Sequence, residues 1–265
     1  MTLPCPVCGT AAAFDARHPE ADLYRCPACG HCFSDPSGAP ETYDPSYFRD
    51  AHRNWFAHPD YAMFGRIERA IGQPRAILDV GCGIGDLLAY LRPRLPSARL
   101  VGIDLAAPAP VPGVEFVQGD IMQTEIADSY DVVVTLQTIE HIGAVQPFAA
   151  RLAALCRPGG LVIVGTVNER STVYRAARAL KTLGMSTAFN RLYSRHHVNH
   201  FSVPSLRRLV TGAGLAVVSE AVHNYPLAKV DVPQAGPLMS AAYRAAVAAL
   251  FSVGPGVLQT LVCRR

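Results

Sequence analysis

Short apolar runs alternate with amphipathic runs along most of this chain. The first apolar run spans residues 76–80, and an amphipathic run follows it from about 85 to 92. Apolar runs of about four to eight residues predict strands, and longer runs with helical spacing predict helices. We therefore predict strands at 99–103, 114–117, 131–135, 161–166 and 215–222, and helices at 145–156 and 203–213. This alternation indicates an α/β fold with a doubly wound, mostly parallel sheet.

Further elements flank these runs. Residues 60–72 predict a helix ending at Gly72, and residues 257–263 predict an antiparallel strand, the seventh of the sheet. Residues 157–160 read Arg-Pro-Gly-Gly and predict a turn that opens the strand at 161–166. The apolar stretch 241–262 is broken by Arg244 and by glycine and proline at 254–256, so it predicts a helix and a strand rather than a membrane span.

Two cysteine pairs near the N-terminus indicate a metal site. Four of the eight cysteines stand in two Cys-Pro-x-Cys-Gly motifs, separated by seventeen residues: Cys5, Cys8, Cys26 and Cys29. Each motif turns two thiolates toward one point, and this spacing is typical of a four-cysteine zinc site. Cys32 is an alternative fourth ligand, although the motif favours Cys29, and His31 is expected to be a neighbour rather than a ligand.

These features divide the chain into three parts. We predict a zinc ribbon over residues 1–40, a linker and helical segment over 41–74, and the α/β domain over 75–265, with an insertion at 169–200. Metal binding would supply most of the folding energy of so short a ribbon. The start of the chain shows no basic and apolar regions of a secretory signal, so we expect a cytoplasmic protein without a membrane partner.

A glycine-rich loop joins the first core strand to its helix. Gly81, Gly83 and Gly85 follow the strand, and a nicotinamide-binding loop would have its third glycine at the position of Asp86. With Asp79 before it, the loop resembles the first motif of class I S-adenosylmethionine (SAM)-dependent methyltransferases, (D/E)-x-G-x-G-x-G. Further residues match the ordered motifs of that family across residues 76–167: Asp104, Asp120, Asp131, Glu140-His141 and Arg157-Pro158-Gly159-Gly160.

The resemblance implies how SAM would be bound at the carboxyl ends of the strands. Asp104 would accept hydrogen bonds from both ribose hydroxyls, and Asp120 and Ile121 would contact the adenine. The other implied SAM contacts are the loop glycines together with Asp79, Leu105, Leu136 and Gln137. The alternative for each carboxylate is that it only caps a helix or a turn.

Three histidines are candidate general bases, because their pKa lies near the working pH. His141 follows Glu140, and the acid-histidine pair has a catalytic role in some members of the family and a structural one in others. His197 and His200 lie before the helix at 203–213, in a stretch that resembles one found in small-molecule methyltransferases. In the similar ubiquinone-pathway O-methyltransferases, a further acid that helps hold a metal stands at the position of Gln137, which argues against a catalytic metal here.

Two further segments bear on the acceptor. The insertion contains many cations and interleaved aromatic residues, so it predicts either a lid for an anionic acceptor or a solvated helix face: Arg170, Arg175, Arg178, Lys181, Arg191 and Arg195. The aromatic residues of 43–61 would either dock the ribbon onto the main domain, or cover SAM or line the acceptor pocket: Tyr43, Tyr47, Phe48, Trp55, Phe56 and Tyr61.

The combined expectation is SAM-dependent methyl transfer to a small-molecule acceptor, an anionic metabolite, a sugar or a natural-product intermediate. One alternative is an RNA methyltransferase whose ribbon binds nucleic acid. However, the net charge is only +3, and residues 1–40 carry two arginines against four acids. A second alternative is a non-catalytic SAM-binding scaffold whose ribbon recruits a partner.

Overall fold

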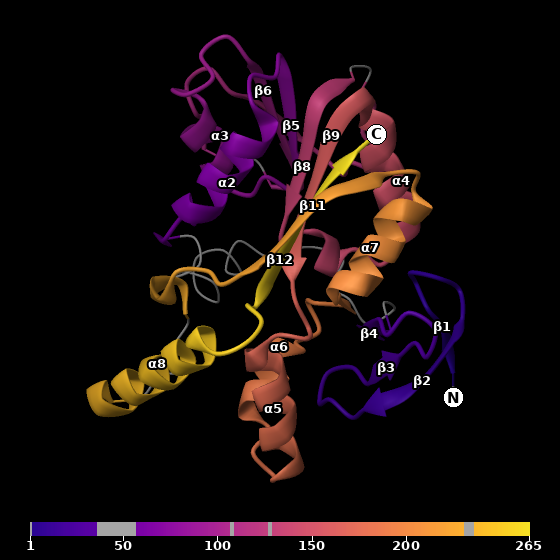
Figure 1. The fold of residues 1–265 in the computed structure, drawn as a ribbon, viewed down its shortest axis with the longest axis vertical. Coiled ribbons are helices and arrows are strands. Elements are labelled where there is room, and N and C mark those ends of the chain that lie inside the picture. Colours follow the sequence, from indigo (N-terminus) through magenta and orange to yellow (C-terminus); the bar gives the residue numbers. More distant parts are fainter. Residues whose placement is uncertain (1, 36–56, 107–108, 127–128, 231–235) are drawn as a thin grey trace.

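A seven-stranded sheet forms the centre of the computed structural model, which describes residues 2–35, 57–106, 109–126, 129–230 and 236–265 (Figure 1). The strand order is β11-β12-β9-β8-β5-β6-β7. Five adjacent strands are parallel: β7 (Glu115–Gln118), β6 (Arg99–Asp104), β5 (Ala76–Val80), β8 (Tyr130–Leu136) and β9 (Cys156–Val167). β12 (Leu258–Arg264) is antiparallel to both β9 and β11 (Ala216–His223). The predicted mostly parallel, seven-stranded sheet is therefore confirmed.

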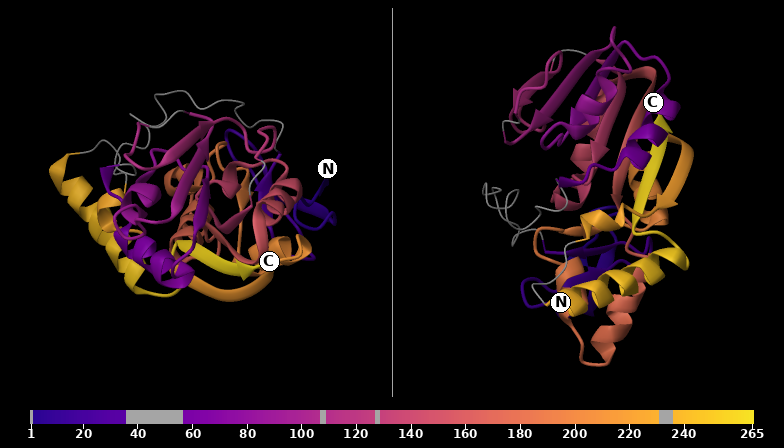
Figure 2. Two further views of the ribbon diagram at one scale, coloured as in Figure 1. Left: turned by 90° about the horizontal axis from the view of Figure 1, so that it is seen from above. Right: turned by 90° about the vertical axis from the view of Figure 1, so that its left-hand side faces the viewer.

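Helices cover both faces of this sheet (Figure 2). α2 (Tyr61–Ile71) and α3 (Asp86–Leu91) pack with Ile77 of β5, whereas Leu78 packs with α4 (Val145–Leu155) and α7 (Val203–Gly212). Successive strand residues point to opposite faces, so one apolar strand serves both layers. The remaining long helix is α8 (Pro237–Ser252), and among the helices that the structure describes none has both the length and the apolarity needed to cross a bilayer.

One predicted turn is incorporated into a strand. Residues 157–160 lie within β9, and the register of β9 against β8 shifts between Tyr130 and Val132. Gly159 has a φ of 76°, and its N–H donates to the carbonyl oxygen of Arg265 at 2.9 Å. Glycine tolerates this left-handed conformation, so the strand continues through an irregularity where the sequence predicted a break.

The N-terminal module (residues 2–35) is a small antiparallel sheet: β1 (Leu3–Pro4), β2 (Ala11–Ala16), β3 (Leu23–Arg25) and β4 (Cys32–Ser34). Its fifth strand, β10 (Asn199–His200), comes from the insertion (residues 169–200), which also contains α5 (Thr172–Thr182) and α6 (Thr187–Leu192). The predicted boundary at residue 40 and the aromatic residues at 43–56 lie outside the described residues.

An ion-pair network joins the N-terminal module to the insertion. Arg25 and Arg178 each contact both Asp15 and Glu169, with Arg25–Glu169 at 2.6 Å and Arg178–Asp15 at 2.7 Å. The Tyr193 hydroxyl also donates to Glu169 at 2.8 Å. Glu169 is only 5% exposed, whereas the arginine side chains are 27–30% exposed, so this network links the two parts at a partly buried interface.

This network engages several of the cations of the insertion. Arg178 pairs with carboxylates, Lys181 donates to the carbonyl oxygen of Arg17, and the guanidinium of Arg170 lies against Gly30. Three of the six cations therefore face the N-terminal module, because the module presents Asp15 and backbone carbonyls to α5. Tyr61, the described member of the aromatic segment, is 62% exposed and lies beside Tyr90 on α3.

Glu169→Ala is expected to lower the free energy of unfolding by roughly 2 kcal/mol, because it leaves two half-buried arginines with one carboxylate between them. The matched control is Glu115→Ala, which removes the exposed Arg99–Glu115 pair and should cost less than about 1 kcal/mol. Urea unfolding followed by circular dichroism measures both. Equal losses in the two variants would contradict a structural role for the network.

Candidate active site

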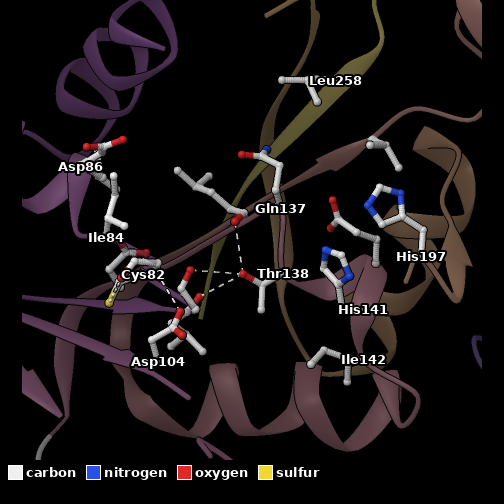
Figure 3. Close-up of a pocket in the computed structure, with 18 of the residues that line it drawn as sticks. Cys82, Ile84, Asp86, Asp104, Gln137, Thr138, His141, Ile142, His197 and Leu258 are labelled. Carbon is white, nitrogen blue, oxygen red and sulfur yellow. Dashed lines mark hydrogen bonds between the residues drawn. The ribbon is translucent and has the colours of Figure 1, made fainter. Parts of the chain in front are cut away.

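A cavity of about 470 Å³ lies at the carboxyl ends of the parallel strands (Figure 3). Ligands of doubly wound sheets bind at this edge. Eleven of the predicted site residues line the cavity: Asp79, Gly81, Gly83, Asp104, Leu105, Asp120, Ile121, Leu136, Gln137, His141 and His197. Gly85 and His200 do not line it.

The glycine loop is held by contacts from two other strands. Gly81 has a φ of 71°, and a Cβ there would lie 2.2 Å from the Thr138 hydroxyl oxygen, so only glycine fits. The N–H of Gly83 donates to Asp104 at 2.8 Å. Gly85, with a φ of 84°, precedes the first residue of α3 and shapes the loop from outside the cavity. Thr138 could not be predicted from the sequence, because its contact with the loop depends on the pairing of β5 with β8.

Two carboxylates lie close together below the loop. Asp79 is 3% exposed, and burial together with the nearby charge of Asp104 raises its pKa to about 7. Asp104 accepts from the N–H groups of Gly83 and Ala106, one on each carboxylate oxygen, and each oxygen retains a further lone pair. This pair favours a ligand that brings positive charge and hydroxyl donors.

Gln137 lies between the two ends of the cavity and has an unusual backbone. Its φ of 49° is the one positive φ at a non-glycine position among the described residues. Its N–H donates to the carbonyl oxygen of Gly165 at 2.8 Å, and its buried Nε2 has no hydrogen-bond partner within the described part of the chain. Strained backbone and an unsatisfied donor occur together at ligand-binding sites.

His141 and His197 form a pair at the other end of the cavity, with ring centroids 4.7 Å apart. His141 Nδ1 lies 2.6 Å from the carbonyl oxygen of His196. A carbonyl oxygen only accepts, so Nδ1 carries the hydrogen and Nε2 is the basic nitrogen of the neutral ring. Beside them, Glu140 accepts from the Thr166 hydroxyl at 2.7 Å, and burial raises its pKa to about 7.

His200 does not join this pair, so its predicted role at the cavity is wrong. It is 1% exposed and packs 4.5 Å from the ring of Tyr193, and burial lowers its pKa. The reason is the pairing of β10 with β4, which places His200 opposite Cys32 and inside the interface with the N-terminal module.

Two groups of side chains could hold a metal ion. The first group is the four thiols of Cys5, Cys8, Cys26 and Cys29. Three pairs of their Sγ atoms, Cys5–Cys29, Cys8–Cys26 and Cys8–Cys29, lie 3.5–3.6 Å apart. Zinc bound tetrahedrally at Zn–S distances of about 2.3 Å requires S–S separations of about 3.8 Å, so the donor set fits. Cys32 lies apart, beside Arg178. The second group is Glu140, His141 and His197, whose ligand atoms lie within 4.8 Å of one another.

Four further residues that line the cavity could not be predicted from the sequence. They come from the insertion and from segments beside β11 and β12, whose positions depend on tertiary packing: Leu192, Tyr225, Lys229 and Leu258. Tyr174, an aromatic residue of the predicted lid, lines the cavity as well. Lys229 is 7% exposed, and burial lowers its pKa. Arg191 is the insertion cation that lines the cavity.

Comparison with known proteins is consistent with this site. A family model described as a methyltransferase domain matches residues 50–220. A probable S-adenosylmethionine-dependent methyltransferase of Mycolicibacterium smegmatis is 29% identical over 226 residues, 80% of this chain and 80% of that protein. The ubiquinone biosynthesis O-methyltransferase of Mesorhizobium japonicum is 31% identical over 138 residues, 47% of this chain and 51% of that enzyme. This chain thus spans about half the length of that enzyme.

A solved structure shares the fold. The structure of Burkholderia thailandensis 1,6-didemethyltoxoflavin-N1-methyltransferase contains 1,6-didemethyltoxoflavin and S-adenosylhomocysteine. It aligns with a TM-score of 0.56 and 16% sequence identity, over 96% of this chain and 99% of that one. At this identity the likeness concerns the arrangement of strands and helices.

The free energy of unfolding of the ligand-free protein is expected to fall as pH rises from about 4 to about 7, relative to Asp79→Asn. The raised pKa of Asp79 means that the native state retains a proton that the unfolded chain releases near pH 4. Stability from the protonated form is present below about pH 4 and lost through pH 7. Urea unfolding across this pH range measures the free energy of unfolding of both proteins. Glu140→Gln is measured in the same way and reports the separate contribution of Glu140. If the free energies of wild type and Asp79→Asn change with pH in parallel, the raised pKa of Asp79 is contradicted.

Proposed function

Because this chain belongs to the methyltransferase domain family and is a SAM-dependent methyltransferase, we propose that it methylates a small-molecule acceptor deprotonated by His141. The observation that carries the proposal is the single cavity region joining the Asp79–Asp104 pair to the His141–His197 pair. In Figure 3, Gln137 and Thr138 lie between Asp104 and the two histidines. One ligand end can therefore be held by carboxylates while the other faces a base.

SAM would occupy the carboxylate end. The two ribose hydroxyls can donate to the remaining lone pairs of Asp104, and the adenine can lie between Ile121 and the carboxylate of Asp120. The sulfonium and ammonium charges of SAM match the Asp79–Asp104 pair, and Nε2 of Gln137 is a donor suited to the methionine carboxylate. Each contact uses a group that the structure leaves able to accept or donate.

The chemistry then needs an in-line approach and a proton acceptor. SAM supplies an activated methyl group, so the protein must orient the acceptor nucleophile and take its proton. Nε2 of His141 is the nitrogen that can accept, because Nδ1 donates to the His196 carbonyl oxygen. His197, packed on the ring of His141, would orient the acceptor beside it.

The lining of the acceptor end favours a compact, partly apolar acceptor. Tyr174, Leu192 and Leu258 supply apolar surface, and Arg191 supplies a cationic group that would suit an anionic substituent. RNA recognition by the N-terminal module is less favoured, because Arg25 is engaged by Asp15 and Glu169. The Burkholderia thailandensis enzyme, which shares the fold, contains bound 1,6-didemethyltoxoflavin, a small molecule.

The N-terminal module is proposed to be a zinc ribbon. Its four thiols have the number, type and spacing of ligands for structural zinc. The cysteine ligands would fill all four positions of the metal, so it would contact no substrate and would stabilise the folded module.

Asp104→Asn is expected to weaken binding of S-adenosylhomocysteine by 5- to 150-fold, about 1–3 kcal/mol, since the amide cannot accept from both ribose hydroxyls and both backbone N–H groups. Isothermal titration calorimetry measures the affinity. Glu115→Gln, on neighbouring β7 and outside the cavity, is the matched control and should bind as wild type does. Unchanged affinity in Asp104→Asn would remove Asp104 from the ribose site.

His141→Gln is expected to reduce kcat by roughly 10²- to 10⁴-fold, the contribution of a positioned general base, with the affinity for SAM retained. The assay is transfer of a radiolabelled methyl group to acceptors selected by screening small hydroxylated and amino compounds. His58→Gln, at an exposed histidine, is the control. Wild-type turnover in His141→Gln would place the base elsewhere.

A further inference from the structure

Asn199 lies at the junction between the N-terminal module and the active site. It is 1% exposed and contacts both parts through its side chain. Its Oδ1 lies 3.0 Å from Nε2 of His31, in the module. Its Nδ2 donates to the carbonyl oxygen of Ile142 at 2.7 Å, one residue after His141. One buried amide therefore bridges the two parts of the molecule.

The partners of Asn199 leave a single consistent orientation for its amide. The Ile142 carbonyl only accepts, so it must face the NH₂ group, and Oδ1 must then face His31. His31 consequently donates from Nε2. This histidine is fully buried between Phe33 and Phe201, with ring centroids 5.8 Å and 4.6 Å away. The bridge is therefore directional and shielded from water.

The second cysteine motif sets the position of His31. The N–H of Cys26 donates to the carbonyl oxygen of His31 at 2.9 Å, which closes the turn that carries Cys26 and Cys29. The same module segment continues into β4, where the N–H of Ser34 donates to the carbonyl oxygen of Val198 at 2.9 Å. The thiol cluster, His31 and the chain before Asn199 thus form one continuous unit.

Two hydrogen bonds run in opposite directions between residues 139–142 and 196–199. His141 Nδ1 donates to the carbonyl oxygen of His196, and Asn199 Nδ2 donates to the carbonyl oxygen of Ile142. His197 lies along the chain between His196 and Asn199, the two residues that make these hydrogen bonds. The two bonds therefore hold the backbone of His197 beside His141, and the centroids of the two rings lie 4.7 Å apart.

We infer that Asn199 is a positioning residue for the His141–His197 pair, and that the N-terminal module holds Asn199 in place when metal occupies its four cysteines. This inference rests on the proposed function, in which His141 is the base. The ion pairs of Arg25 and Arg178 with Glu169 keep the module against the insertion. The module would therefore act by holding in place the insertion residues that line the cavity, here called the acceptor wall: Tyr174, Arg191, Leu192 and His197. SAM contacts lie at the other end of the cavity and do not depend on this bridge.

The test observes His141 directly and needs no acceptor. Full-length protein labelled with ¹⁵N-histidine and saturated with S-adenosylhomocysteine is studied by long-range ¹H–¹⁵N NMR, with His141 assigned from the spectrum of His141→Gln. The perturbations are Asn199→Ala, Cys26→Ser, and wild type stripped of metal with EDTA and restored with Zn²⁺. Cys26→Ser separates loss of metal at the four cysteines from loss of metal at Glu140, His141 and His197. Asn168→Ala is the matched control, since Asn168 is 2% exposed and also bridges two segments, donating to the carbonyl oxygen of Gly256.

In wild type, His141 is expected as the single tautomer with hydrogen on Nδ1. Asn199→Ala, Cys26→Ser and the metal-stripped protein should show mixed tautomers of His141 and a changed His141 pKa. Addition of Zn²⁺ to the stripped protein should restore the wild-type signal of His141. Asn168→Ala should leave that signal unchanged. The affinity for S-adenosylhomocysteine should stay within about twofold throughout. With an acceptor in hand, kcat of Asn199→Ala should fall roughly 10- to 100-fold.

An unchanged His141 signal in both Asn199→Ala and the stripped protein would overturn the inference. If Asn199→Ala does not fold, His31→Leu replaces it and carries the same two outcomes. Failure of the proposed function is distinguishable, because absence of turnover on every acceptor would leave the NMR result standing. Conversely, methyl transfer that is unaffected by Asn199→Ala would sustain the function and remove the positioning role.

Discussion

The parallel direction of five adjacent strands is the constraint on which the site depends. It brings the carboxyl ends of β5, β6, β7 and β8 to one edge, so Asp79, Asp104, Asp120 and Gln137 meet although 58 positions separate the first from the last. The edge also sets the electrostatics, because burial, together with the nearby charge of Asp104, raises the pKa of Asp79. A cationic ligand would offset the repulsion between the two carboxylates, which a neutral nucleoside would not do.

The second half of the site is built by segments outside the sheet. The insertion supplies His197, Tyr174 and Arg191, and its last strand completes the sheet of the N-terminal module. The interface combines apolar packing with ion pairs around Glu169, so removing the module would expose both. A small sheet of this kind has little core of its own, and the zinc proposed at its four cysteines would supply much of its stability. The insertion and the thiol cluster are in this way joined through one shared sheet and its ion pairs.

The contrast between predicted and missed residues has a physical basis. The positions of Asp104 and Asp120 at the cavity could be predicted, because local hydrophobic patterning reveals the strand ends that they follow. The buried position of His200 could not be predicted, because it depends on the pairing of β10 with β4, a contact between residues about 170 positions apart. Lys229 and Thr138 carry no local signal. The seven-stranded sheet was predictable throughout, apart from the strand continuation through Gly159, where glycine permits a bulge that resembles a turn in sequence.

A crystal structure of the full-length protein with S-adenosylhomocysteine, recorded with anomalous data at the zinc edge, tests the central claim most directly. The account predicts ribose hydroxyls on Asp104, the sulfur directed toward the His141–His197 pair, and one zinc bound by Cys5, Cys8, Cys26 and Cys29. A nucleoside bound away from Asp104, or a sulfur directed away from both histidines, would contradict the assignment of the two ends of the cavity.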